Sequence, residues 1–292
     1  MDYFTIKDLE KLSGIKAHTI RIWEQRYEFL KPKRTDTNIR CYTNEDLKRV
    51  LNIAFLNKYG FKISHIDKMN EEEREKKILS LSDQKAQYER VVNDLVKFMI
   101  DVEVERIEEV LENQIHLTGV EEMITKIIFP FMEKIGILWV TNHINPAQEH
   151  LVSNLIRQKL IVAIDKVVSD VKIDKSVLLF LPEGEFHELG LLFVCYLLKR
   201  KGIYTIYLGS NMPLKDVQYL VNLKKPNYVY THLTSVGKNF SFDKFLSEIN
   251  KRFINTPIVL SGLLANNYEK KIPQHIQFKK SLAEVMDFVE KL

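Results

Sequence analysis

Residues Ser13–Tyr27 read SGIKAHTIRIWEQRY and decide the fold of the first part of the chain. The Ser-Gly pair that opens this stretch breaks a short helix expected over Ile6–Leu12, and a second helix is expected over about Ala17–Tyr27. Thr5, with Asp8 three residues later, predicts a capping-box-like start for the first helix. Two short helices joined by a glycine-containing turn are typical of a helix-turn-helix.

The neighbouring residues extend this domain. Lys33–Thr43, KRTDTNIRCYT, is polar with β-prone ends and predicts a two-stranded wing, and a capped helix is expected over Glu45–Lys58. On the second helix, Ile20 and Trp23 lie three residues apart and can be buried against the first helix. Glu24 is expected to orient a neighbouring side chain.

Positive charge is concentrated in the same region. The 292 residues carry a net charge of +4, with 45% hydrophobic and 28% charged residues, which is an ordinary globular composition. Residues 1–70 hold 14 Lys and Arg against 9 Asp and Glu, a net of +5, whereas residues 71–292 hold 29 against 30, a net of −1. Clustered basic residues on one small domain favour a nucleic acid as its partner.

Three segments of this block match a known family in order and spacing: FTIKDLEKLSGI at residues 4–15, HTIRIWEQRY at 18–27 and LKPKRTDTNIRCYTNEDL at 30–47. They resemble the MerR family of transcription regulators. The resemblance implies a winged helix-turn-helix over residues 1–70 that binds double-stranded DNA, as a homo-oligomer on an inverted-repeat operator. The second helix would enter the major groove and the wing would lie against phosphates. The DNA contacts it implies are Lys16, His18, Thr19, Arg21, Arg26, Tyr27, Arg34, Asn38, Arg40 and Tyr42.

Cysteine use and hydropathy favour a cytoplasmic protein without membrane contact. Cys41 and Cys195 are too few for a disulfide framework and do not form a thiolate cluster for metal sensing. The N-terminus MDYFTIKDLEKL carries charges where a signal peptide needs an apolar segment, and no apolar run is long enough to cross a membrane.

The middle of the chain is helical by period. Apolar residues recur at three- and four-residue spacing, and turns expected at His116–Gly119 and His143–Pro146 divide the region into roughly four helices. A helical bundle over residues 85–170 is therefore predicted. The charged run Asn70–Lys77, NEEEREKK, is either an exposed helix start or part of a linker over residues 71–84.

From Val177 onward, apolar strand-length runs alternate with helical segments. Strands are expected at Val177–Pro182, Ile203–Leu208, Tyr228–Leu233 and Ile258–Leu260. This alternation predicts βαβ units and a flavodoxin-like (Rossmann-like) doubly wound parallel sheet over residues 171–292. The chain is thus expected to be a multi-domain protein with α and α/β parts.

The loop after the first of these strands carries the motif Glu185-Phe-His187-Glu-Leu-Gly190. It lies at the carboxyl end of a parallel strand, where open α/β sheets bind ligands. A histidine there can ligate a metal through one ring nitrogen, while Glu185 accepts the other N–H and fixes the tautomer. Gly190 would let a bulky ligand approach the backbone.

Two further pieces follow: 40 residues lead to Thr231-His232-Leu233, and another 27 lead to Ser261-Gly262. The three pieces together resemble the cobalamin-binding domain of methionine synthases and mutases. The resemblance implies that His187 is an axial ligand of cobalt, backed by Glu185, and that the displaced nucleotide tail lies near the other two pieces. The cofactor contacts it implies here are Glu185, His187, Gly190, Thr231, Leu233, Ser261 and Gly262.

The chain departs from this family pattern at two positions. Thr231 adds a methyl group to the family's serine, and Ser261 replaces a glycine where the tail passes close to the backbone. His232 is expected to be only a strand residue. The alternative is a flavodoxin-like domain that has kept the fold and lost the cofactor.

The bundle carries another motif. Trp139, nine residues and then Glu149-His150 resembles the helical cap of cobalamin-dependent MerR-type photoreceptors of the CarH and LitR kind. The resemblance implies that Trp139 packs against the adenosyl group of adenosylcobalamin, that Glu149 hydrogen-bonds its ribose and that His150 belongs to the same site. The alternative is a tryptophan in the bundle core and a Glu-His pair on a solvated helix.

One departure concerns light. In the light-responsive branch a histidine directly follows that tryptophan and takes the upper cobalt position after photolysis, whereas this chain has Val140. His116, His143 and His150 are the remaining candidates for this position. Photochemical switching is therefore the least supported part of the resemblance.

Two functions follow from these observations. The first is a DNA-binding repressor with adenosylcobalamin as its sensory ligand, in which light changes the oligomer, a dimer or a tetramer. The alternative is a cobalamin-independent MerR-type regulator whose C-terminal half is a protein-interaction or oligomerisation module, for instance for an antirepressor. An enzyme is not expected, because a DNA-binding block is present and 292 residues leave no room for a barrel-sized substrate domain.

Overall fold

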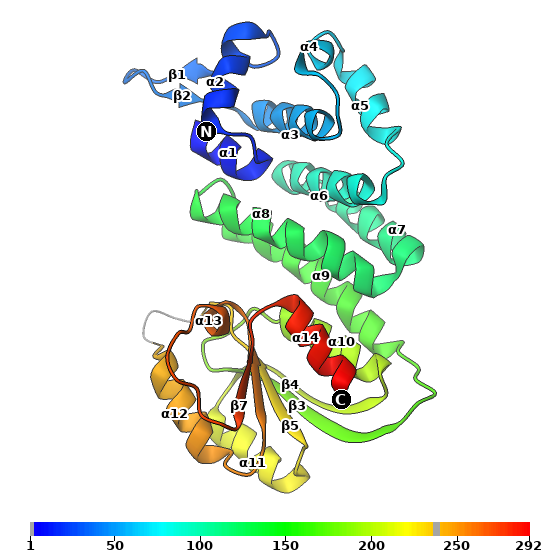
Figure 1. The fold of residues 1–292 in the computed structure, drawn as a ribbon, viewed down its shortest axis with the longest axis vertical. Helices are drawn as coiled ribbons and strands as arrows, with labels where there is room; N and C mark the ends of the chain where they lie inside the picture. The colour runs from blue at the N-terminus through cyan, green and yellow to red at the C-terminus, as the bar shows by residue number, and fades with distance from the viewer. Residues whose placement is uncertain (1–2, 236–239) are drawn as a thin grey trace. The chain divides into compact units, whose positions relative to one another are not determined.

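The computed structural model describes residues 3–235 and 240–292 (Figure 1). The chain separates into two compact units, Met1–Leu155 and Ile156–Leu292. Each unit is built around its own buried apolar side chains. Within the described residues, no helix is both long and apolar enough to cross a membrane.

The first unit begins with the predicted winged helix-turn-helix. Its elements are α1 (Ile6–Ser13), α2 (Ala17–Arg26), β1 (Lys33–Arg34), β2 (Arg40–Cys41) and α3 (Asn44–Lys58). Thr5 and Asp8 form the expected capping box, and α1 ends at Gly14, whose φ of 74° is a left-handed value that suits glycine. Strands β1 and β2 pair antiparallel, which confirms the wing.

The charged run that begins at Asn70 is helical. Helices α4 (Ile63–Ile66) and α5 (Glu71–Leu79) follow α3. Asn70 caps α5 in a capping box with Glu73, and the acidic first turn suits the positive end of the helix dipole. Ile78 is buried where α5 packs on α3. The charged run is therefore an exposed helix start and not a linker without structure. The domain boundaries stay predictions.

The bundle has four helical stretches, as expected. They are α6 (Gln84–Asp101), α7 (Val104–Glu122) with the π-helical turn η1 (Met123–Ile128), α8 (Phe129–Val140) and α9 (Pro146–Asp165). Gly119 has φ 82° and ψ 167°, so it kinks α7, and the chain continues through η1 into α8. The turn predicted at His116–Gly119 is this kink. The turn at Val102, whose φ is 58°, was not expected.

The second unit contains the predicted parallel sheet, in the order β4-β3-β5-β6-β7. The strands are β3 (Ile173–Pro182), β4 (Ile203–Met212), β5 (Tyr228–His232), β6 (Ile258–Ser261) and β7 (Ile276–Lys279). All of the pairings are parallel and the order is flavodoxin-like, which confirms the fold class. Strand β7 was not expected, because IQFK is short and half polar.

Helices cover both faces of this sheet (Figure 1). They are α10 (Leu189–Arg200), α11 (Leu214–Lys224), α12 (Phe242–Arg252), α13 (Leu263–Asn266) and α14 (Leu282–Lys291). Because strand side chains alternate, Val229 of β5 packs with apolar residues of α11 and α12, whereas Tyr228 and Tyr230 lie against Phe288 of α14. Helix α10 packs beside α14. The Glu185–Gly190 loop thus joins β3 to the α10–α14 face.

Candidate functional sites

The helix-turn-helix exposes most of the residues predicted to contact DNA. Trp23 is 4% exposed and Ile20 is fully buried, which confirms that this side of α2 packs into the core. Exposed among the predicted contacts are Lys16, His18, Arg21, Arg26, Arg34 and Asn38, and partly exposed are Thr19, Tyr27 and Arg40. Helix α2 and the wing therefore present donors suited to phosphates and base edges.

Glu24 ties α2 to the wing. Its Oε2 accepts a hydrogen bond from Nε of Arg40 at 2.7 Å, and its Oε1 accepts one from the hydroxyl of Tyr42. Burial and this hydrogen bond raise the pKa of Tyr42, so its hydroxyl stays protonated. The resemblance implied that Tyr42 contacts DNA. In the structure Tyr42 is fully buried, so its side chain does not face a phosphate. Its role in the structure is to hold Glu24, and Glu24 orients Arg40 as expected.

Residues of the bundle form hydrogen bonds with both ends of helix α1 of the DNA-binding domain. His143, in the loop after α8, places Nε2 3.2 Å from Oδ2 of Asp8, and its ring stacks on Phe4 with centroids 3.9 Å apart. At the other end, Nζ of Lys134 donates to the carbonyl of Leu12 at 2.5 Å. Neither contact was expected from the sequence, since the partners lie more than a hundred residues apart.

His143 is enclosed by this contact. Its side chain is 6% exposed and that of Asp8 is 9% exposed. Burial by itself raises the pKa of Asp8, but hydrogen bonds from Thr5 and His143 hold it below its usual value. A ring with this degree of enclosure is poorly placed to reach a ligand, so His143 is the weakest of the three histidines that could replace the residue missing at Val140.

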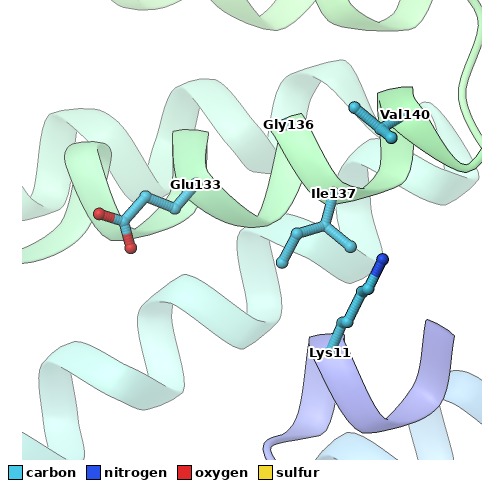
Figure 2. A pocket seen from close by; sticks show the side chains of 5 residues that line it. All are labelled: Lys11, Glu133, Gly136, Ile137 and Val140. Carbon is cyan, nitrogen blue, oxygen red and sulfur yellow. The ribbon is translucent and has the colours of Figure 1, made fainter. Parts of the chain in front are cut away.

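An open pocket lies beside this contact, between α1 and α8 (Figure 2). It is lined by Lys11, Glu133, Gly136, Ile137 and Val140. Figure 2 shows Ile137 and Lys11 pointing toward one another across it. Val140 is 78% exposed. The position that departs from the light-responsive pattern therefore borders the DNA-binding domain.

The cap motif lies at the end of α8 and the start of α9, with Trp139 and His150 exposed and Glu149 partly exposed. Trp139 is 43% exposed, so it is not a residue of the bundle core. Oε2 of Glu149 lies 2.7 Å from Nδ1 of His150, and the His150 side chain is 70% exposed. An exposed tryptophan with a polar Glu-His pair is suited to a ligand that has both a ring and hydroxyl groups.

Glu185 and His187 form the second histidine–carboxylate pair. Nδ1 of His187 lies 2.6 Å from Oε1 of Glu185, and the backbone N–H of His187 donates to the same oxygen at 2.9 Å. The other oxygen, Oε2, accepts from the backbone N–H groups of Thr234 and Ser235 at 2.7 and 2.9 Å. The carboxylate is fully buried, whereas the His187 side chain is 56% exposed.

This geometry suits a metal ligand. Burial raises the pKa of Glu185, but the hydrogen bonds from His187 and Thr234 outweigh it and hold that pKa below its usual value. An ionised Glu185 favours the proton on Nδ1 of His187, so that a metal would be bound through Nε2. The residues present therefore fit the cobalt-ligand half of the predicted site.

The loop that carries His187 is fixed by residues that the sequence did not point to. Glu188 is 9% exposed and accepts hydrogen bonds from Nε of Arg157 and the hydroxyl of Tyr207, both at 2.7 Å. On the other side, the amide oxygen of Asn211 accepts from the N–H of Gly184 at 3.0 Å. The only signal in the sequence was that Glu188 directly follows the motif histidine.

The space beside Gly190 is occupied by the protein itself. A Cβ atom on Gly190 would lie 2.6 Å from Nε2 of His232, so the imidazole of His232 lies directly against the glycine. Nδ1 of His232 is 2.8 Å from Oγ of Ser261, which lies 2.6 Å from the hydroxyl of Tyr230. His232 is therefore more than a strand residue, and the predicted contacts Gly190 and Ser261 meet around its ring.

The other predicted contacts lie nearby in different surroundings. Thr231 pairs with Phe180 and Leu260 across the sheet, and its Oγ1 is buried without a hydrogen-bond partner. Gly262 has φ 98°, and a Cβ atom there would lie 2.3 Å from the carbonyl oxygen of Leu233. The unpartnered hydroxyl of Thr231 is a group that a ligand could satisfy, whereas Gly262 is needed for the approach of the chain's own backbone.

Comparison with known proteins identifies the two parts of this architecture. The model of the MerR HTH family regulatory protein matches residues 4–73, and that of the B12 binding domain matches residues 91–163. The HTH-type transcriptional repressor CarA of Myxococcus xanthus is 26% identical, over 91% of this chain and 89% of its own length. The repressor CarH of the same organism is 23% identical, over 91% of each. The chain is a homologue of the CarA and CarH repressors.

Other similarities are narrower. The HTH-type transcriptional regulator MlrA of Escherichia coli is 33% identical over 66 residues, which are 23% of this chain and 27% of that protein. The monomethylamine corrinoid protein of Methanosarcina barkeri superposes with a TM-score of 0.54 at 15% identity, over 70% of this chain and 99% of that one, which shows a shared fold.

The comparisons confirm the MerR-type resemblance and the presence of a B12 binding domain. The B12 model falls on the bundle, from α6 to α9, where the sequence predicted a cobalamin cap. The homologues are transcription regulators rather than enzymes, as expected. The chain is thus a DNA-binding regulator with a B12-binding region.

Proposed function

We propose that this regulator is a repressor that uses cobalamin, in its adenosyl form, as a sensory ligand. The observation that carries the proposal is the Glu185–His187 pair, a fully buried carboxylate behind a half-exposed imidazole at the carboxyl end of a parallel strand. In the same chain, α2 and the wing expose the residues suited to DNA. Sensor and effector thus belong to one polypeptide.

In this proposal His187 binds cobalt through Nε2, and Glu185 holds the tautomer. Trp139, Glu149 and His150 contact the upper ligand, as the exposure of Trp139 supports. The chemistry that the cofactor supplies when bound is a cobalt–carbon bond that light can break. The ligand acts on DNA binding only if it prefers one assembly of the protein over another.

The proposal also covers how the protein assembles on DNA and where in the cell it acts. A homodimer bound to an inverted repeat would present two copies of α2 to successive major grooves. We propose such an oligomer, a dimer or a tetramer, acting in the cytoplasm. Residues Arg21 and Arg26 of α2 and Arg34 of the wing are the exposed cations best suited to the operator.

An absorption spectrum tests the sensory half. The full chain is mixed with adenosylcobalamin in the dark, desalted, and read before and after green light. Retained cofactor with a histidine-ligated spectrum supports the proposal, and a change after illumination supports a light response. His187→Ala should lose that spectrum, while His65→Ala, which removes an exposed histidine outside every predicted site, should keep it. Loss of the cofactor from the unmodified chain on desalting contradicts the proposal.

A second function is favoured by one observation. His232 fills the space beside Gly190 and is bonded to Ser261, so the site beside that glycine is occupied by the protein itself. In this alternative the C-terminal half is an interaction module for an antirepressor or for self-association, and no cofactor is used. The same experiment distinguishes the two, because a cofactor-free regulator retains no cobalamin at any stage and its oligomeric state is unchanged by adding it.

A further inference from the structure

The slot between α10 and the end of β5 is closed by one ring. The ring of His232 lies so close to Gly190 that a Cβ atom on that glycine would lie 2.6 Å from Nε2, and no side chain would fit there unless the ring shifted. The imidazole of His232, at the end of β5, thus fills the space against the backbone of α10 at Gly190. Removing this ring would open a slot next to the loop that carries His187.

Two hydroxyl groups hold the ring in the slot. Oγ of Ser261 lies 2.8 Å from Nδ1 of His232 and 2.6 Å from the hydroxyl of Tyr230. Tyr230 is fully buried and its ring stacks on Phe288 of α14, with centroids 6.2 Å apart. The chain Tyr230–Ser261–His232 is therefore anchored in the core and ends at the slot. The ring can leave only by giving up its bond to Ser261.

The slot and the metal-binding pair share one backbone turn. Glu185, which positions His187, is bonded to the backbone N–H groups of Thr234 and Ser235. These residues follow His232 directly after Leu233. His232 is therefore close in the chain to the residues that hold Glu185, and the space it fills belongs to the same part of the fold as His187.

We propose that His232 is a specificity-determining residue that disfavours corrinoids with a lower nucleotide tail. The inference rests on the proposed binding of a corrinoid by His187. The macrocycle needs the exposed imidazole of His187, whereas the tail needs the slot that His232 fills. An intact cobalamin must displace the ring and break its hydrogen bond to Ser261, while a cobinamide, which lacks the tail, leaves the ring in place.

The test is a change in selectivity. Dissociation constants of adenosylcobalamin and adenosylcobinamide are measured in the dark for the full chain and for His232→Ala. The cost of detaching the tail's base from cobalt is the same in both proteins, so it cancels in the comparison. We expect His232→Ala to bind adenosylcobalamin about tenfold more tightly, the effect of about 1.4 kcal/mol. Binding of adenosylcobinamide should change by less than about threefold, since that corrinoid has no tail to displace the ring.

Two further variants complete the design. Ser261→Ala keeps the imidazole but removes the bond that holds it, so the same shift should appear at about threefold, within the range of one hydrogen bond. This variant also preserves the test if His232→Ala does not fold. Tyr230→Phe removes a hydroxyl that bonds Ser261 but not the ring, and should change the selectivity by less than Ser261→Ala does. Circular dichroism confirms that each variant is folded.

The possible outcomes distinguish the role of His232 from the proposed binding of a corrinoid by His187. A ratio of the two dissociation constants that is the same in the unmodified chain, His232→Ala and Ser261→Ala overturns the role of His232, while leaving corrinoid binding intact. Failure of every protein to bind either corrinoid overturns the proposed function and this inference together. A shift confined to adenosylcobalamin supports both.

Discussion

The chain contains two histidine–carboxylate pairs with the same chemistry and opposite surroundings. In the first unit, His143 and Asp8 are 6% and 9% exposed, and the histidine is stacked on Phe4. In the second unit, Glu185 is fully buried but His187 is 56% exposed. The first pair has both partners inside the protein, whereas the second turns one partner outward.

The difference shows how exposure decides what such a pair can do. A buried pair holds two elements together, here α1 and the loop after α8. A pair with a buried carboxylate and an outward imidazole keeps the tautomer fixed and leaves the ring accessible from outside. We therefore assign a structural role to His143 and a ligand-binding role to His187.

Removing the outward histidine gives the largest expected effect on ligand binding. His187→Ala should weaken retention of adenosylcobalamin by at least about a hundredfold, the effect of about 2.7 kcal/mol, because it deletes the metal ligand. The free energy of unfolding should fall by about 1 kcal/mol, because Glu185 loses one side-chain hydrogen bond but keeps those from the backbone N–H groups of Thr234 and Ser235. Equilibrium absorption titration and urea unfolding measure the two quantities. Unchanged retention would remove His187 from the site.

Removing the buried histidine, His143, should lower the stability of the fold and leave cofactor binding unchanged. His143→Ala removes one hydrogen bond from Asp8, which keeps those from Thr5, and takes the stacked ring from Phe4, so the free energy of unfolding should fall by about 2–3 kcal/mol. The histidine-ligated spectrum of the bound cofactor should be unaffected. Urea unfolding of the full chain checks the stability, with His65→Ala as the control for loss of an exposed histidine. A fully stable His143→Ala variant would break the comparison between the two pairs.

The DNA-binding surface should respond independently of both pairs. Arg21→Ala removes an exposed cation from α2, and operator binding should weaken by about tenfold with a shallower dependence on salt. Cofactor binding should not change. Fluorescence anisotropy at several salt concentrations measures the effect, and Lys215→Ala, an exposed cation on α11, serves as the control. Equal losses in both variants would mean that only overall charge matters.

The buried pair should also be visible in the pH dependence of stability. Because the pKa of Asp8 is lowered in the folded chain, its contribution is present above the usual aspartate pKa of about 4 and is lost as the pH falls through the folded value. Asp8→Asn should therefore reduce the loss of stability as the pH falls below about 4. Urea unfolding at a series of pH values tests this, and an identical pH profile would contradict it.

The smallest expected effect concerns light. Val140→His places an imidazole at an exposed position next to Trp139. In the light-responsive regulators that the chain resembles, a histidine at this position binds cobalt after photolysis. The absorption change after green light should therefore become about two- to threefold faster or larger. Val140→Asn, which is polar but a poor cobalt ligand, is the matched control. Equal responses in the two variants would show that Val140 is not the missing ligand.

Much of the molecule was predictable because its signals are local. The capping box at Thr5, the helix break at Gly14 and the alternation of apolar strands after Val177 are each decided by neighbours in the sequence. The Glu185–His187 pair was predictable for the same reason, since its members are two residues apart. Strand β7 was not, because four residues with two polar side chains carry little hydrophobic pattern.

The sequence by itself determined the order of the parts, the DNA-binding domain, the parallel sheet and the pairing of Glu185 with His187. Only the tertiary structure decided which polar residues meet across the fold. Asp8 and His143 are 135 residues apart, and His232 reaches Gly190 and Ser261 from separate elements. The physical reason is that burial and partner choice depend on packing between distant segments, and packing is what distinguished an enclosed histidine from an accessible one.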